Sequence, residues 1–205
     1  DQRIAVREWT PVAGGSAGDW SPLQLLGAAA SGMNAQVDAA RIAMVDPAGG
    51  QLARRALVWT YDADGDPNTN DDRRLAFAVF NAGAWGTTLL GEQTRRADSP
   101  TIALSVSDQE HAALAFLVRG KDGDGQTDIG PLSNRARLWV AMVTMLDGSV
   151  RNAQPAPGER GAPVYAERPR LVSAANGETL LTFRRFGNPG EHLWLGQTAL
   201  ARQAS

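Results

Sequence analysis

The sequence predicts an all-β fold built from repeated four-stranded antiparallel meanders. Short apolar segments rich in Val, Ile, Leu and aromatic residues recur along the chain, and Gly, Pro, Asp and Asn flank them, which is typical of strands joined by hairpin turns. The connections between these segments also recur in the same order from one group to the next. A helical period is absent from every ten-residue stretch outside the alanine-rich region 27–40, which Gly32 interrupts.

Composition and charge narrow the classes of protein and partner. The 205 residues are 43% hydrophobic and 20% charged, which is the balance of a globular protein with enough apolar material for a core. A formal net charge of -2 creates no overall field that would attract nucleic acid or an anionic membrane, so we expect neither as a partner. No apolar run reaches the roughly 18 residues that a membrane span needs. The absence of cysteine excludes disulfides, thiolate catalysis and cysteine-based zinc sites.

One four-residue segment occurs four times, at intervals of 71, 63 and 55 residues. A loose spacing of this size is expected when each repeat is a group of four strands with loops of variable length. The four copies are Arg3-Ile4-Ala5-Val6, Arg74-Leu75-Ala76-Phe77, Arg137-Leu138-Trp139-Val140 and His192-Leu193-Trp194-Leu195.

Two further series of segments lie between these copies. We expect the first series to form strand one of each group and the second to form strand two, with the four-residue segment above as strand three. Strand one is predicted at Arg41-Ile42-Ala43-Met44-Val45, Thr101-Ile102-Ala103-Leu104-Ser105-Val106 and Arg170-Leu171-Val172-Ser173-Ala174. Strand two is predicted at Ala56-Leu57-Val58-Trp59-Thr60-Tyr61, Ala113-Leu114-Ala115-Phe116-Leu117-Val118 and Thr179-Leu180-Leu181-Thr182-Phe183.

Polar turn residues separate these strands in a consistent way. Strands one and two are joined by tight turns within 46–50, 107–110 and 175–178, which are rich in Asp, Asn, Gly and Ser. Strands three and four are joined through Gly18-Asp19-Trp20, Gly83-Ala84-Trp85 and Gly148-Ser149-Val150. Each group therefore reads as a meander of four strands.

The meanders resemble the blades of β-propeller proteins, and the Gly-x-Trp turns resemble the Asp-box turn of sialidase-like propellers. Ser16-Ala17-Gly18-Asp19-Trp20 keeps the serine, glycine and tryptophan of that turn without its full spacing, whereas Asn81-Ala82-Gly83-Ala84-Trp85 lacks the aspartate. The alternative explanation for these tryptophans is packing between blades, because a large ring after a glycine turn buries much apolar area.

The resemblance implies one repeat domain of about three blades. Its parts are the outer strands of a partial blade in 1–26, whole blades in 38–93 and 97–155, and a partial blade in 165–201. Propellers close with about four to eight blades. We therefore expect the chain to belong to a larger ring, completed by further blades or by another protein chain. A β-sandwich or a twisted stack of meanders is the alternative architecture, since neither needs closure.

Two acidic loops between strands two and three are the strongest chemical signal. The first runs from Asp62 to Asp72, and its alternating oxygen ligands on a glycine-containing turn suit Ca²⁺. It resembles the Asp-x-Asp-x-Asp start of EF-hand loops, although Arg73 stands where the closing glutamate would be. The predicted ligands in this loop are Asp62, Asp64, Asp66, Asn68, Asn70 and Asp72.

The second acidic loop resembles the calcium loop of integrin-type propeller repeats. Asp122, Asp124 and Asp128 match its ligands, whereas Gly120 occupies the first ligand position. Residues 187–191 in the third copy are short and lack the aspartates. Asp, Asn and Gly also make good solvated turns without any metal, so that explanation stays open for both loops.

No common catalytic motif is present. The sequence has no Gly-x-Ser-x-Gly elbow, phosphate loop or His-Glu-x-x-His, and we expect its two histidines, His111 and His192, at the surface or at strand edges. A sialidase-like hydrolase or lyase would need an arginine cluster, a tyrosine and acid partners. Candidates for that alternative lie close together in the sequence, at Tyr165, Glu167, Arg168 and Arg170.

The sequence is thus best interpreted as an extracytoplasmic, bacterial β-propeller segment that recognises a protein or a glycan or serves in assembly, with calcium holding one or two loops. We expect an extracellular, cell-surface or periplasmic location. The alternative is a segment of a sialidase-like glycoside hydrolase or lyase. An apolar lining of the central channel would favour the binding or scaffold module, whereas arginines and carboxylates converging there would favour the enzyme.

Overall fold

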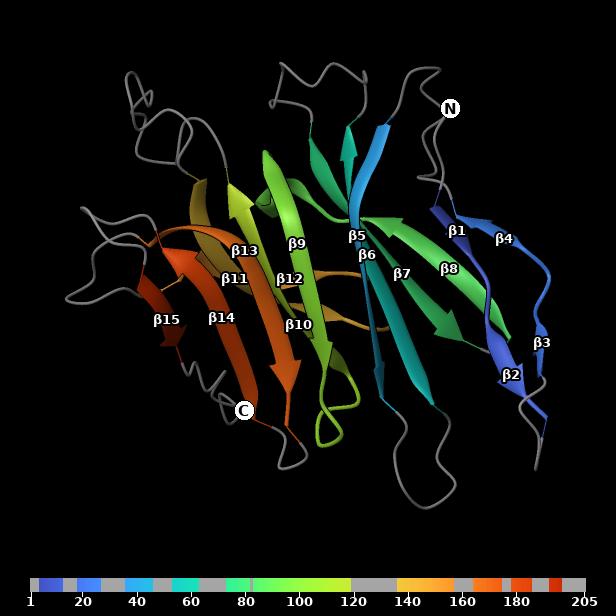
Figure 1. Ribbon diagram of the computed structural model, residues 1–205. Helices are drawn as coiled ribbons and strands as arrows, with labels where there is room; N and C mark the ends of the chain where they lie inside the picture. The colour runs from blue at the N-terminus through green and yellow to red at the C-terminus, as the bar shows by residue number, and fades with distance from the viewer. Residues whose placement is uncertain are drawn as a thin grey trace.

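The prediction of an all-β, antiparallel fold is confirmed by a computed structural model of the chain (Figure 1). The structure describes residues 4–12, 18–26, 36–45, 53–62, 73–81, 83–118, 136–156, 164–174, 178–185 and 192–196. Within these residues the single helical element is the 3-10 turn η1 (Glu92–Thr94). No helix in the described part of the chain is long and apolar enough to cross a membrane.

The strands follow one another in sequence order. They are β1 (Ile4–Val6), β2 (Trp9–Pro11), β3 (Gly18–Trp20), β4 (Gln24–Leu26), β5 (Gln36–Val45), β6 (Arg54–Asp62), β7 (Arg74–Asn81), β8 (Ala84–Leu89), β9 (Ala97–Leu104), β10 (His111–Val118), β11 (Ala136–Thr144), β12 (Val150–Pro155), β13 (Tyr165–Ser173), β14 (Thr179–Arg185) and β15 (His192–Gly196).

Consecutive strands pair with each other to form meanders. The order β5-β6-β7-β8 makes a four-stranded sheet, and β9, β10, β11 and β12 pair in the same succession. The start of β13 then joins the edge of β11, and β13, β14 and β15 form the last meander. Near the N-terminus β1 pairs with β4 and β2 with β3, so these four strands make an antiparallel hairpin in two short pieces.

A β-bulge precedes the central part of β5, β9 and β13 at the same place in each strand. The register places Arg41 opposite Val58, Thr101 opposite Ala115 and Arg170 opposite Thr182, and it shifts just before each of these pairs. In β9 and β13 the bulge contains Ser99 and Arg168, whose φ angles are 47° and 51°. A bulge adds a residue and increases the local twist, so all three strands bend at the same level.

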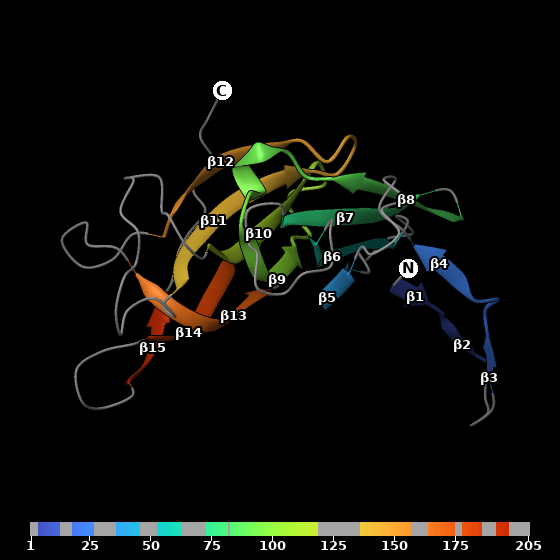
Figure 2. The ribbon, with the colours of Figure 1, turned by 90° about the horizontal axis from the view of Figure 1, so that it is seen from above.

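The interior strands are apolar on both faces because both faces are covered. In β6, Ala56 and Val58 belong to one core cluster, whereas Leu57 and Trp59 belong to another on the opposite side of the sheet. Strand β10 alternates in the same way between two clusters. Successive side chains of a strand point to opposite faces, so a continuous apolar run indicates a sheet that lies between two neighbours. The sheets are accordingly packed face to face in a row (Figure 2).

The first strands of the three meanders lie side by side. Strands β5, β9 and β13 run in the same direction, and β9 lies between and contacts the other two (Figures 1 and 2). Thr101 in β9 accepts a hydrogen bond from the backbone N–H of Leu171 in β13 through its Oγ1, over 3.1 Å. The three strands therefore form one surface that crosses all three meanders.

One expected turn is a strand instead. Gly18-Asp19-Trp20 forms β3, which pairs with Trp9–Pro11. A Cβ atom at Gly18 would lie 2.6 Å from the Trp9 ring, so the glycine serves the close approach of a neighbouring tryptophan. Gly83 and Gly148, by contrast, are turn residues with φ angles of 88° and 72°, a conformation that glycine adopts without strain.

Phe116 provides a test of this packing. It is fully buried in the cluster between the first two four-stranded sheets and stacks on Trp139 with ring centroids 6.4 Å apart. We expect Phe116→Ala to lower the free energy of unfolding by about 3–5 kcal/mol, because it removes apolar contacts and leaves a cavity. Leu146→Ala, at a side chain that is 91% exposed, is the matched control and should change stability little. Denaturant unfolding measures both, and equal effects would contradict the described packing.

Candidate functional site

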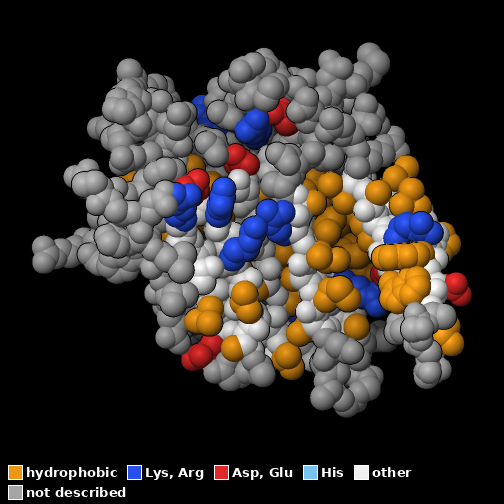
Figure 3. Space-filling model, in the orientation of Figure 1, with side chains coloured by type: hydrophobic (Ala, Val, Ile, Leu, Met, Phe, Trp, Pro, Cys, Tyr) orange, Lys and Arg blue, Asp and Glu red, His pale blue; other side chains and the backbone are white. Residues whose placement is uncertain are grey.

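An apolar groove crosses the surface that β5, β9 and β13 share. It encloses about 440 Å³. Figure 3 shows hydrophobic side chains gathered around β5, and arginine side chains gathered toward β9 and β13. The groove is lined by Ile42, Ala43, Met44, Val45, Ile102, Ala103, Leu104, Val106, Leu171, Val172, Ser173 and Ala174. None of these lining residues carries a charge.

Arginines lie at one end of the groove, just before the lining segments of β5 and β13. Both fold back on their own strand. Arg41 donates from Nη1 to the carbonyl oxygen of Ala40 over 2.7 Å, and Arg170 donates from Nη1 to that of Pro169 over 3.3 Å. Thr101 occupies the equivalent position in β9, between the two arginines, and its Oγ1 accepts a hydrogen bond from the backbone of β13. This end of the groove is therefore basic, and the lining itself stays neutral.

Near the other end of the groove, a side-chain link joins the first two meanders. Arg54, at the start of β6, donates to the carbonyl oxygen of Asp108 over 2.7 Å and to that of Ser105. Burial lowers the pKa of Arg54, and the nearby charge of Asp108 offsets part of that effect. The guanidinium is thus a structural bridge between strands that are about fifty residues apart in sequence.

Of the four residues considered for a hydrolase, Arg170 lies at the basic end of the groove, but none of them lines it. Glu167 forms an ion pair with Arg184 across the hairpin of β13 and β14, with Oε1 3.3 Å from Nε. Tyr165 lies at the opposite end of β13 from the lining segment, in register with Arg137 of β11. Arg168 is part of the bulge. The arrangement gives Glu167 a structural partner and places Tyr165 in the joint between two meanders.

Asp62 is the predicted calcium ligand that lies in the described part of the chain. It ends β6, its side chain is only 6% exposed, and its Oδ2 is 3.1 Å from Nε of Arg73. Arg73 also lies 4.0 Å from Oδ2 of Asp98 in the next meander. Arg73, which stands where an EF-hand has its closing glutamate, therefore pairs with the carboxylate at the start of the loop.

The other eight predicted ligands lie outside the described residues. They are Asp64, Asp66, Asn68, Asn70, Asp72, Asp122, Asp124 and Asp128. Among the residues that are described, no group of three acidic or histidine side chains forms a metal site. His111, the first residue of β10, instead lies beside Asp108 of the preceding turn, with Nδ1 3.2 Å from Oδ1.

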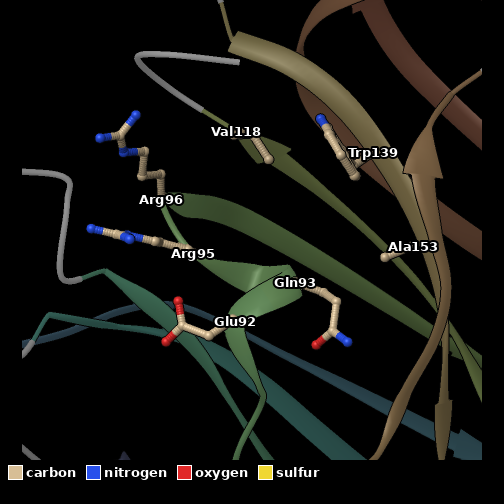
Figure 4. Close-up of a pocket in the computed structure, with 7 residues that line it drawn as sticks. All are labelled: Glu92, Gln93, Arg95, Arg96, Val118, Trp139 and Ala153. Carbon is tan, nitrogen blue, oxygen red and sulfur yellow. The ribbon is translucent and has the colours of Figure 1, made fainter. Parts of the chain in front are cut away.

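A second pocket lies beside η1 and also encloses about 440 Å³ (Figure 4). Val118, Trp139 and Ala153 form its apolar wall, and η1 and the residues after it form a polar rim. The rim residues are Glu92, Gln93, Arg95 and Arg96. Glu92 pairs with Arg74 over 3.0 Å, and the buried Nε1 of Trp139 has no hydrogen-bond partner in the described structure.

No sequence pattern indicated this second pocket. It forms where η1 meets β10, β11 and β12, which brings together residues up to about sixty positions apart. An indole donor next to an amide and arginines suits a ligand rich in oxygen acceptors. Glu92, the one carboxylate of the rim, is paired with Arg74. The described lining of the pocket therefore provides a binding surface, without a pair of carboxyl groups for acid–base catalysis.

No family model matches the chain, and no curated protein or solved structure is significantly similar to it.

The ion pair of Asp62 and Arg73 can be tested by a double-mutant cycle. We expect Arg73→Met to destabilise the protein by roughly 3 kcal/mol, because it leaves a buried carboxylate without its cation. Asp62→Asn combined with Arg73→Met should cost clearly less than the sum of the single changes, since neither partner then leaves an uncompensated charge. Arg170→Met, at an exposed arginine, is the control. Additive effects of the two changes would show that the pair is not coupled.

Proposed function

We propose that the chain is a segment of a β-propeller that acts as a binding or scaffold module for a protein or a glycan. The central support is the groove across β5, β9 and β13, whose lining is apolar and uncharged. Strand one of each blade surrounds the axis of a propeller, so this groove corresponds to the wall of the central channel. A wall of this kind presents shape and apolar surface to a partner.

The array of sheets supports the propeller interpretation. Three meanders begin with strands that lie side by side and run in the same direction, and each of these strands has a bulge at the same level. Strands β6 and β10 are covered on both faces, as the strands of a blade are by neighbouring blades. Blades of four antiparallel strands around a common axis have these properties.

A hydrolase is less well supported. Acid–base cleavage of a glycosidic bond requires a pair of carboxyl groups on either side of the bond. The groove lining includes no carboxylate within the described residues, and Glu167 is engaged by Arg184. The basic end of the groove is compatible with an anionic group on a bound partner, which a binding module can use equally well.

The proposal includes Ca²⁺ as a structural ligand of the loops 62–72 and 122–128, and a location outside the cytoplasm. Long loops of alternating aspartates repel themselves when no cation is bound, and bound calcium offsets that repulsion. The ion pair at the base of the first loop, between Asp62 and Arg73, fixes the strand ends from which the remaining ligands extend.

Calcium binding predicts a rise in thermal stability. With free Ca²⁺ at about a hundred times its dissociation constant, the folded state gains about 2.7 kcal/mol, which for a chain of this size corresponds to roughly 5–10 °C in the thermal midpoint. We expect that rise on adding CaCl₂ after chelation, and its loss in an Asp64→Asn, Asp66→Asn double variant. Asp147→Asn, at an exposed turn, is the control. A midpoint indifferent to calcium would remove the metal from the proposal.

A separate assay of glycoside cleavage distinguishes the proposed binding module from an enzyme. A binding module should release no fluorophore from fluorogenic sialosides or other glycosides above the buffer rate. Turnover that Glu167→Gln abolishes, while the thermal midpoint stays unchanged, would overturn the proposed function in favour of the hydrolase.

A further inference from the structure

Two apolar side chains of β5 are exposed at positions that are buried in β9. The registers of the two hairpins make Ile42 equivalent to Ile102, and Met44 equivalent to Leu104. Ile102 and Leu104 are 4% and 3% exposed, because the preceding sheet packs against them. Ile42 and Met44 are 52% and 62% exposed. The face of β5 that carries them therefore has no inner strand packed on it within the described structure.

The N-terminal hairpin covers only the outer part of the same face. Val6 and Leu26 pack against Leu57, Trp59 and their neighbours in β6 and β7. Ala40 of β5 also packs against this cluster, but Ile42 and Met44 of the same strand stay exposed. The hairpin thus occupies the position of strands three and four of a blade and leaves the position of strands one and two unoccupied.

The sequence position of β1 is that of strand three in a four-stranded meander, and its pairing can be compared with that of the other third strands. Strands β7 and β11 each pair on both edges, with a preceding and a following strand. Strand β1 pairs with β4 alone among the described strands. An exposed edge next to an exposed apolar face is a position for two more strands.

The opposite end of the array exposes a matching surface. Val172 of β13 and Leu180 of β14 are opposite each other, and they are 59% and 38% exposed. The equivalent pair in the second meander, Ala103 and Ala113, is buried at 5% and 9% exposure. Strands β13 and β14 thus form an inner strand pair with one uncovered face, on which Val172 and Leu180 lie beside Arg170 and Thr182.

We propose that β13 and β14 of a second copy of this chain fill the open place beside β1 and β5, and that two copies close one ring. The inference rests on the proposed propeller. It continues an interface that the chain already forms twice, between its first and second meanders and between its second and third. Each copy contributes two whole blades and two half blades, so the pair closes a ring of six. Rings of about four to eight blades are the usual range.

Strand exchange makes the fit possible. In the ring, β1 of the partner takes the edge of β14 that β15 occupies in the single chain. The two competing segments are similar, since Arg3-Ile4-Ala5-Val6 and His192-Leu193-Trp194-Leu195 belong to the same series. In the ring β1 keeps this edge of β14 paired and β15 is displaced from it, so one antiparallel strand pairing replaces another.

Light scattering coupled to size exclusion tests the proposal. The unmodified chain should elute with twice the 21.7 kDa mass of one copy at micromolar to submillimolar concentration. Ile42→Asp and Val172→Asp should each halve that mass without loss of cooperative unfolding, since both side chains are exposed in the single chain. Leu146→Asp, at an exposed side chain outside both surfaces, is the control and should leave the mass at two copies.

Mixing the two variants distinguishes an interface between two different surfaces, β13–β14 on one copy and β5 on the other, from an interface in which the same surface of both copies meets. The Ile42→Asp chain keeps an intact β13–β14 surface and the Val172→Asp chain keeps an intact β5 surface, so together they should regain a two-chain mass through one interface. A chain truncated after residue 188, which lacks β15, should form the two-copy species more tightly.

A single-copy mass for the unmodified chain overturns the proposal, and so does failure of the mixed variants to associate. The remaining occupant would then be a strand pair from outside this chain. The calcium response and the glycoside assay do not depend on the mass, so they show separately whether the proposed function survives.

Discussion

The structure depends on one constraint, which is that each interior sheet must be covered on both faces. Strands β6 and β10 place apolar side chains on both sides, so one neighbour is not enough to remove them from water. At about 25 cal/mol per Å² of apolar surface, each uncovered face would cost several kcal/mol. The face-to-face row of meanders meets this constraint in the interior and leaves it unmet at β5 and at β13.

The same constraint explains where charged groups are placed. Arginines near the boundaries between meanders have polar partners. Arg54 donates hydrogen bonds to backbone carbonyls of the next meander. Arg73 pairs with Asp62 and Asp98, and Arg55 pairs with Glu8 of the N-terminal hairpin. Arg55 also lies over the Phe80 ring at 4.8 Å. These contacts connect sheets to each other at their rims, where apolar packing ends. The groove, in contrast, is apolar along its lining and basic only at one end.

Much of the fold could be predicted from the sequence, because strand alternation and turn residues are local signals. The segments beginning at Arg41, Thr101 and Arg170 fall on β5, β9 and β13, although the second extends two residues and the third one residue past the strand end, and the all-β antiparallel prediction is confirmed. The prediction of a turn at Gly18 was wrong. The residue lies in a strand, and the glycine is required by the close approach of the Trp9 ring, which is nine residues away in the sequence. The pocket beside η1 was not predictable either, since it depends on contacts among four elements. The calcium ligands beyond Asp62 remain a prediction.

Native-state hydrogen exchange, resolved by strand, tests the central claim most directly. Strands covered on both faces should open only with global unfolding, whereas edge elements open locally. The account predicts the slowest exchange in β6 and β10, and faster exchange in β1, β4 and β15 under conditions where the chain is a single copy. Equal protection across all strands of the single chain would contradict it, because coverage of both faces would then not be what determines stability.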